Sequence, residues 1–281
     1  MSYQLIDCKH GKFLVNQKDT YIGRSLYNTG EYCDEEVALL GKICEEGDIV
    51  IDGGANIGAL TIPLAKKLGS GKMIAFEPQQ PIFQNLCANI SLNTINNVIA
   101  LPYGLGEVCE SLYLKLSPTI DGNSNYGMAS VSHEQTDTVV EVRSLSSVFQ
   151  QYNLSSLKLI KLDIEGMELP ALKGAEPLID KFKPFLYVEN DKEKYSHDLI
   201  NWILSKDYII YYHVTPYFHE NNYFGCTVND MLGGSANLFC YHKDQILAPD
   251  VAETLQKFTQ IKSPEQLKFK GNGVIEWTTW S

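Results

Sequence analysis

The fold of this 281-residue chain is indicated by one stretch, Asp52-Gly53-Gly54-Ala55-Asn56-Ile57-Gly58. A short apolar run, 48–51, precedes this stretch, and a helical pattern follows it to about Leu68. The glycines therefore lie in a turn between a predicted strand and a predicted helix. Because glycine has no Cβ, Gly54 and Gly58 allow a sharp turn and the close approach of a ligand. We expect a ligand at this turn.

The acid that opens the turn indicates the kind of ligand. The spacing Asp52-x-Gly54-x-x-x-Gly58 differs from the G-x-G-x-x-G pattern of dinucleotide-binding turns. A carboxylate repels a pyrophosphate but attracts a cation. S-adenosylmethionine (SAM) carries a sulfonium and an ammonium and no phosphate, so the pattern favours SAM. Glu77 ends the next predicted strand, where an acid accepts hydrogen bonds from ribose hydroxyls of any adenosyl ligand.

Strands and helices alternate beyond this turn. The predicted strands are 48–51, 72–76, 98–101, 139–142, 157–162 and 185–188, and the predicted helices between them include 80–93, 145–152 and 168–181. This rhythm is typical of βαβ units, so we expect an α/β fold with a doubly wound, mostly parallel sheet. Residues 208–212 and 237–241 are predicted to close the sheet as an antiparallel pair.

The remaining segments suggest three parts of the chain. We expect a small N-terminal β/α extension at 1–46, a SAM-binding domain at 47–243 and a C-terminal extension of unassigned structure at 244–281. Residues 117–135 are rich in Ser, Asn, Gly and Asp, and predict a long loop of the kind that covers binding sites. Pro63 is predicted to lie in or near the first turn of its helix, where proline is tolerated.

A second group of candidate residues follows later strands. Asp163 and Glu165 come directly after the strand 157–162, and Glu189 ends the strand 185–188. Carboxyl ends of strands in open α/β sheets bind ligands, so these acids are candidates for the general base, and Asp163 also for the SAM ammonium. His213 and His219 flank a predicted loop over the site and are candidate acceptor-binding residues or bases.

Three further features of the sequence allow both a functional and a structural interpretation. Asp163, Glu189, Asn190 and Asp191 could together chelate Mg²⁺, but they form no compact metal signature, so no metal is favoured. Glu168 begins the next helix, and there it complements the helix dipole. The aromatic residues of 208–224 can line a pocket, but core packing is the more frequent use of such residues.

Four motifs occur in the order found in one family. The motifs are Asp52–Gly58, Phe76-Glu77-Pro78, Lys161–Glu168 and Leu172-Lys173-Gly174-Ala175. Together they resemble the FkbM family of SAM-dependent methyltransferases. The resemblance implies a Rossmann-like class I methyltransferase fold and, usually, O-methylation of a sugar, polyketide or similar hydroxyl. Together with the analysis above, it gives these candidate cofactor-binding residues: Asp52, Gly53, Gly54, Asn56, Gly58, Glu77, Pro78, Gly104 (near the adenine) and Asp163.

Composition excludes several other classes of protein. Lys and Arg number 23 and Asp and Glu 34, which gives a net charge of −11 and disfavours nucleic-acid binding. The sequence contains neither an apolar run long enough to span a membrane nor a signal peptide at its start, so we expect a cytoplasmic protein. Its seven scattered cysteines predict neither a disulfide framework nor a zinc site. A homodimer through 1–30 or the tail is left open.

The sequence thus favours a SAM-dependent methyltransferase that acts on a hydroxyl of a small molecule, glycan or natural-product intermediate. Such a transfer is an in-line displacement that needs an aligned acceptor and a base for its proton. The alternatives are an N-methyltransferase on an amine or amide, including peptide side chains, and a non-catalytic SAM-binding protein. A nicotinamide oxidoreductase is disfavoured by the spacing of the glycine turn.

Overall fold

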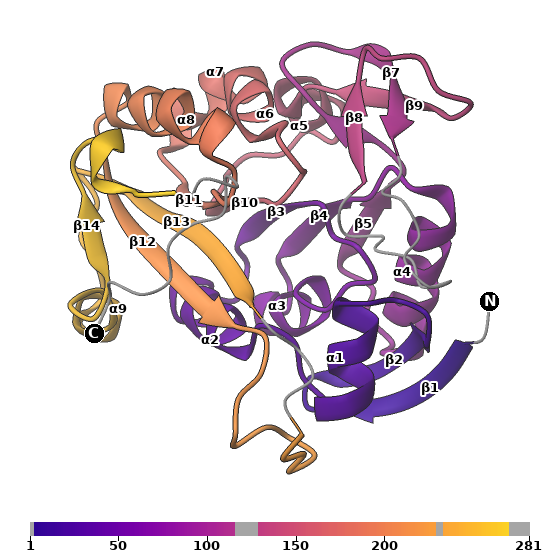
Figure 1. Cartoon of the computed structure of the whole chain (residues 1–281). Helices are drawn as coiled ribbons and strands as arrows, with labels where there is room; N and C mark the ends of the chain where they lie inside the picture. Colours follow the sequence, from indigo (N-terminus) through magenta and orange to yellow (C-terminus); the bar gives the residue numbers. More distant parts are fainter. Residues whose placement is uncertain (1–2, 116–128, 229–232, 270–281) are drawn as a thin grey trace.

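The computed structural model describes residues 3–115, 129–228 and 233–269, and an eight-stranded mixed sheet forms its centre (Figure 1). The strand order is β14-β12-β13-β11-β10-β3-β4-β5. In chain order the strands are β3 (Ile49–Gly53), β4 (Lys72–Phe76), β5 (Val98–Leu101), β10 (Leu159–Leu162), β11 (Phe185–Glu189), β12 (Tyr208–Pro216), β13 (Gly234–His242) and β14 (Thr259–Ile261).

The direction of the strands confirms the predicted topology. β3, β4, β5, β10 and β11 are parallel, whereas β13 is antiparallel to both of its neighbours, β11 and β12. The order runs from β3 through β4 to β5 on one side and from β10 to β11 on the other. The sheet therefore reverses between β3 and β10, and open α/β sheets bind their ligands at such a point, outside the carboxyl ends of the strands.

Helices cover both faces of this sheet (Figure 1). On one face lie α5 (Leu145–Gln151), α6 (Glu168–Gly174), α7 (Glu176–Phe182) and α8 (Glu193–Ser205); on the other lie α2 (Asp34–Ile43), α3 (Thr61–Leu68), α4 (Gln80–Leu92) and α9 (Pro249–Leu255). Successive strand side chains point to opposite faces. Thus Ile51 packs in the layer of α5–α8 and Val50 in the layer of α2–α4, which explains the continuous apolar runs of the sequence.

An N-terminal hairpin and helix pack beside the glycine turn. The hairpin consists of β1 (Tyr3–Cys8) and β2 (Gly11–Asn16), and it is followed by α1 (Ile22–Thr29). Phe13 and Leu26 share an apolar cluster with Ile57 and Ile62, which flank the start of α3. α1 was not predicted, because its buried face includes Gly23, Ser25 and Thr29 and gives little apolar periodicity.

A second, smaller sheet corrects two predictions (Figure 1). Its order is β6-β9-β7-β8, and it contains β6 (Gly104–Leu105), β7 (Glu110–Lys115), β8 (Ser130–Ser132) and β9 (Val139–Arg143). β9 was predicted in the β/α rhythm of the main sheet, but only alternate residues of it are buried, as in a strand that faces solvent on one side. Of the predicted loop 117–135, residues 117–128 lie outside the described residues, and β8 is a strand.

Two other boundaries differ from the predictions. The predicted helix 168–181 is two helices, since α6 ends at Gly174 and Pro177 starts α7, as proline does well at the beginning of a helix. The unassigned tail contributes α9, β14 and a 3₁₀ turn, and β14 extends the sheet beyond β12. Pro63 lies in the first turn of α3, as predicted. No helix within the three described ranges is both long and apolar enough to cross a bilayer.

Candidate active site

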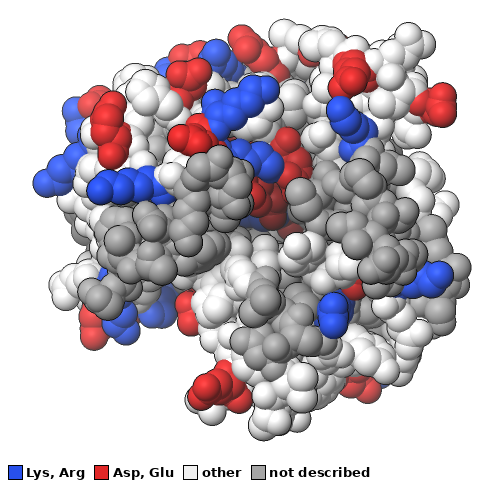
Figure 2. Space-filling model, viewed as in Figure 1, with Lys and Arg blue, Asp and Glu red and all other residues white. Residues whose placement is uncertain are grey.

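A cavity of about 330 Å³ opens at the point where the strand order reverses. The glycine turn after β3, the end of β4 and the ends of β10 and β11 meet there, and residues before α2 and around the β12–β13 connection complete the wall. The side chains and glycines that line the cavity include Tyr21, Tyr32, Glu36, Gly54, Asn56, Glu77, Pro78, Tyr103, Gly104, Lys161, Asp163, Glu165, Glu189, Asp191 and Tyr217. Figure 2 shows Asp and Glu side chains gathered near the middle of this face, beside Lys or Arg side chains.

The glycine turn is held by the protein backbone on two sides. Gly54 has φ +75°, and a Cβ built on it would lie 1.8 Å from the carbonyl oxygen of Asp163. The amides of Gly54 and Ala55 both donate to the carbonyl of Phe76, at 3.0 and 2.9 Å. Glycine is therefore needed here for contact with the residue after β10. Gly58, with φ +92°, lies against Leu86 and does not line the cavity.

Glu77 presents a buried carboxylate to the cavity. Its side chain is 3% exposed, and its two oxygens accept the backbone amides of Asn56, at 3.1 Å, and Gln79, at 2.9 Å. Burial raises the pKa of this carboxyl to about 7. A carboxylate offers about four lone-pair directions, so the backbone amides leave two, for which ligand hydroxyls would compete with the Gln79 side chain. The chain thus brings Glu77 to the glycine turn itself.

The predicted cofactor residues divide into two groups. Six of them line the cavity, namely Gly54, Asn56, Glu77, Pro78, Gly104 and Asp163. Asp52, Gly53 and Gly58 do not. Asp52 is 1% exposed: one oxygen lies 3.0 Å from Lys161 Nζ, and the other accepts the Thr61 hydroxyl at 2.6 Å. The Asp52 carboxylate therefore faces Lys161 and does not line the cavity, contrary to the expectation that Asp52 faces a cationic ligand.

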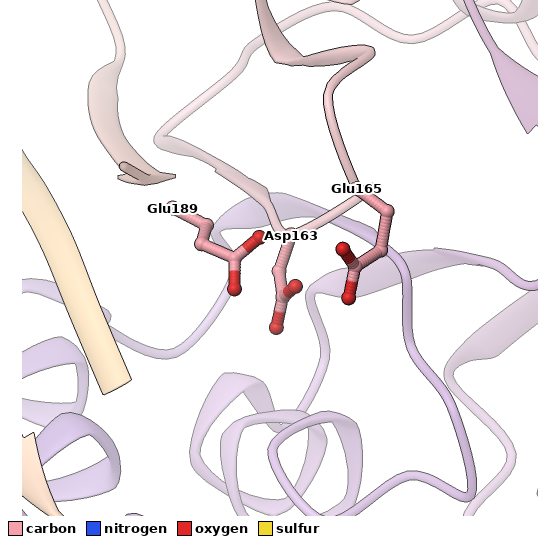
Figure 3. A group of neighbouring side chains, drawn as sticks. All are labelled: Asp163, Glu165 and Glu189. Atoms are coloured by element: carbon pink, nitrogen blue, oxygen red, sulfur yellow. The ribbon is translucent and has the colours of Figure 1, made fainter. Parts of the chain in front are cut away.

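Three carboxylates converge on the other side of the cavity (Figure 3). Asp163 and Glu165 follow β10 and Glu189 ends β11, and one oxygen from each lies within 4.8 Å of the others. The Lys192 ammonium forms an ion pair with Glu165 and lies 3.8 Å from a Glu189 oxygen and 3.6 Å from Asp191. One lysine thus balances part of the charge of a closely spaced acidic group.

The surroundings shift the pKa values of Glu165 and Glu189. Burial raises the pKa of Glu165 to about 7, against the lowering effect of the Lys192 ammonium. Burial also raises the pKa of Glu189 well above its ordinary value, and the neighbouring carboxylates act in the same direction. Perturbed acids in a cleft are typical of functional sites, and a carboxyl with a pKa near 7 suits a general base.

Glu168 organises the turn that carries Glu165. Its carboxylate accepts the backbone amides of Ile164, at 2.9 Å, and Gly166, at 2.9 Å. Glu165 itself has φ +58°, an uncommon conformation for a residue with a side chain. The contacts of Glu168 are therefore with the turn, and through it this residue positions the neighbouring acid.

The acids are also candidate ligands for a hard cation. Asp163, Glu165 and Glu189 supply oxygen atoms of the kind that Mg²⁺ binds. A divalent ion at this position would have to share the carboxylates with the Lys192 ammonium. Asn190, a member of the predicted metal set, does not line the cavity, and its side chain donates to Ser196 at 3.0 Å.

The two candidate histidines lie outside the cavity lining. His213 is buried: its Nδ1 lies 2.8 Å from the Tyr187 hydroxyl, and its ring stacks on Phe258. Burial lowers the pKa of His213 to about 4. His219 Nδ1 lies 3.8 Å from a Glu35 oxygen. The expectation that these residues touch the acceptor is therefore not supported, because β12 turns the His213 side chain into the core.

An aromatic wall faces the acids, and sequence reasoning did not identify most of it. The Tyr32 and Tyr217 rings stack with their centroids 5.7 Å apart, and Tyr21 meets Tyr217 edge-on. Glu36 lies in the same wall, where it accepts from Thr215 and Asn237 at 3.1 and 3.2 Å. The sequence contained one signal for Glu36, since this acid occupies a position among the apolar residues of the predicted helix 31–46.

The sheet order, the antiparallel β13 and the cavity at the strand ends define a Rossmann-like class I methyltransferase fold. The sequence profile of the Methyltransferase FkbM domain matches residues 52–210, more than half of the chain. The chain therefore belongs to the FkbM methyltransferase family.

This chain matches only a little over half of the length of its curated relatives. Methyltransferase 1 of Beauveria bassiana is 29% identical over 148 residues, which are 47% of this chain and 59% of that protein. The hexuronic acid methyltransferase AglP of Haloferax volcanii is 32% identical over 138 residues, 49% of this chain and 54% of that protein. A crystal structure of methyltransferase FkbM from Methylobacillus flagellatus has a TM-score of 0.47 and 21% identity, and covers 69% of this chain and 43% of that one.

Proposed function

We propose that this chain is a SAM-dependent methyltransferase that methylates a hydroxyl of a small molecule, sugar or natural-product intermediate. The observation that carries this proposal is one cavity that joins the glycine turn and Glu77 to the acids Asp163, Glu165 and Glu189. Membership of the FkbM family supports it independently. The first group fits a nucleoside ligand, and the second fits the removal of a proton from an acceptor.

The cofactor side of the cavity suits an adenosyl ligand. Glu77 would accept the ribose hydroxyls, and Pro78, Tyr103 and Gly104 would border the base. A cavity of about 330 Å³ falls in the usual range for small-molecule sites. When bound, SAM supplies an electrophilic methyl group on a sulfonium. The residues around it orient the ligand and keep water away from the reacting atoms.

The acceptor side selects by charge. Acidic side chains predominate there, and they are Glu36, Asp163, Glu165, Glu189 and Asp191. These acids would repel an anionic acceptor, so we propose that the acceptor is a neutral hydroxyl compound. It would differ in this from the hexuronic acid for which AglP of Haloferax volcanii is named. The same acids attract an amine, which makes N-methylation the second candidate.

The first experiment is calorimetric titration of the purified protein with SAM, S-adenosylhomocysteine (SAH) and NAD. We expect SAM and SAH to bind with micromolar dissociation constants and NAD not to bind. Absence of SAM and SAH binding by folded protein would contradict the proposed function. Binding of NAD alone would point to an oxidoreductase.

Binding of SAH is expected to tighten as the pH rises from about 6 to 8. The pKa of Glu77 is about 7 without ligand, and ligand hydroxyls would stabilise the carboxylate, so binding releases a proton. Titrations in buffers of different ionisation enthalpy would measure this release. Glu77→Gln, which has no proton to release, serves as the control. An unchanged proton release in that variant would assign it to another group.

Removal of the general base is expected to slow methyl transfer by about 10² to 10⁴-fold. The variants Asp163→Asn, Glu165→Gln and Glu189→Gln would be assayed with methyl-tritiated SAM and an array of alcohols, glycosides and amines. SAH affinity reports whether the cofactor side is intact, and Asp198→Asn, at an exposed side chain of α8, is the control. Three variants with the wild-type rate would exclude these acids as the base.

The pH profile tests Glu165 as the general base. If Glu165 is the base, the rate rises with pH through about 7, because the carboxyl must be ionised. Lys192→Met removes the ammonium that favours this ionised form, so the profile should shift to higher pH. A profile that stays in place in Lys192→Met would exclude Glu165.

A further inference from the structure

Lys161 is a buried lysine in the middle of the main sheet. It lies on β10 beside Asp52 of β3 in the parallel register, and its residue is 6% exposed. Lysine is seldom buried this far without a partner, because an isolated ammonium is costly to remove from water. Neither the binding of the cofactor nor the removal of the acceptor proton, as proposed above, involves its side chain.

The ammonium of Lys161 has four oxygen neighbours. It donates to the carbonyls of Gly53, at 3.3 Å, and Gly54, at 3.0 Å. It also lies 3.0 Å from a carboxylate oxygen of Asp52 and 3.9 Å from one of Asp163. These four residues belong to the glycine turn, the strand that leads into it and the residue that follows β10.

This arrangement holds the turn by its carbonyls, whereas Glu77 holds it by an amide. Lys161 binds the carbonyls of the turn, whereas the amide of Asn56, further along the turn, donates to Glu77 at 3.1 Å. Buried carbonyls need a donor. The Gly53 carbonyl also accepts the Asp163 amide, at 3.1 Å, so the charged donor matters most at the Gly54 carbonyl. Asp52, in turn, forms an ion pair with Lys161 through one oxygen and accepts the Thr61 hydroxyl with the other.

We propose that Lys161 is a positioning residue: its ammonium holds the glycine turn in the shape that receives the cofactor and orients the Asp163 carboxylate. Asp52 balances the charge of this ammonium, whose carbonyl contacts are separate from it, and does not contact the cofactor. The inference rests on the proposed use of SAM.

The test is calorimetric SAH binding by four proteins: wild type, Asp52→Asn, the double variant Asp52→Asn/Lys161→Met, and Lys158→Met. Asp52→Asn leaves the lysine and its carbonyl contacts and keeps an oxygen for Thr61. The double variant removes both charges, so no unpaired carboxylate remains next to the turn. Lys158 precedes β10, lies 3.9 Å from Asp48 and does not line the cavity, which makes it the matched control.

We expect Asp52→Asn and Lys158→Met to bind SAH within about fivefold of wild type. The double variant should bind about tenfold or more weakly, since two hydrogen bonds from a charged donor are lost. Melting temperatures separate positioning from stability, because a purely structural lysine would change the melting temperature without changing the affinity of the folded protein.

Two results would overturn the proposal. Equal SAH affinity of the double variant and Asp52→Asn would show that Lys161 does not shape the turn. Loss of binding in Asp52→Asn alone, with the fold intact, would return Asp52 to direct cofactor contact; this arm remains decisive if the double variant does not fold. Failure of the wild type to bind SAH would instead contradict the proposed function.

Discussion

Gly54→Ala is expected to abolish SAH binding and to destabilise the protein by about 4 kcal/mol or more. An alanine Cβ would lie 1.8 Å from the Asp163 carbonyl oxygen, and neither backbone can yield without moving β3 or β10. The φ of +75° adds the strain of a left-handed conformation. For a chain of this size we expect the melting temperature to fall by about 10 °C.

A second glycine separates the steric clash from the backbone strain. Gly225 has a similar φ, +66°, but a Cβ built there would meet nothing within 4 Å. Gly225→Ala should therefore cost only about 1–2 kcal/mol and leave SAH binding unchanged. Thermal unfolding and calorimetry of both variants provide the comparison. Equal effects at the two positions would mean that the close contact of Gly54 with β10 is not important.

Glu77→Ala is expected to weaken SAH binding by at least about a hundredfold. The carboxylate would accept two ligand hydroxyls, and hydrogen bonds to a charged group contribute about 1.5–3 kcal/mol each. Calorimetry with SAH measures the loss, and Glu107→Ala, an exposed acid that does not line the cavity, is the control. Wild-type affinity in Glu77→Ala would exclude Glu77 as the ribose acceptor.

Glu77 should lower the stability of the fold near neutral pH, although it favours SAH binding. Burial raises the pKa of Glu77 from 4.5 to about 7, so the folded state favours the protonated form. The stability that this group contributes is therefore present below about pH 4.5 and lost as the pH rises through about 7. Glu77→Gln should accordingly gain melting temperature relative to wild type between pH 5 and 8 while it binds SAH less well.

Local sequence patterns were sufficient for the main sheet. Apolar runs bounded by glycine turns predicted its parallel strands, and the end of each strand then indicated where Glu77, Asp163 and Glu189 lie. Because parallel strands end at one edge of a sheet, these residues meet in space although more than a hundred positions separate the first from the last.

Contacts between distant segments could not be predicted in this way. The one-sided burial of β9 and the pairing of β14 depend on which neighbour each strand finds. The partner of Asp52 was missed because Lys161 follows it by more than a hundred residues. His213 was misjudged because only the orientation of β12 directs its side chain to Tyr187.

The two sides of the cavity come from different stretches of the chain. The glycine turn, Glu77 and the three acids lie within 52–210, the region of the family match, whereas the aromatic wall and Glu36 lie outside it. Under the proposed function, the shared region thus supplies the cofactor side and most of the acids of the acceptor side, and the flanking segments add the aromatic wall and Glu36 to the acceptor side. A change at Tyr21, Tyr32 or Tyr217 would then alter the acceptor wall and leave the glycine turn and Glu77 as they are.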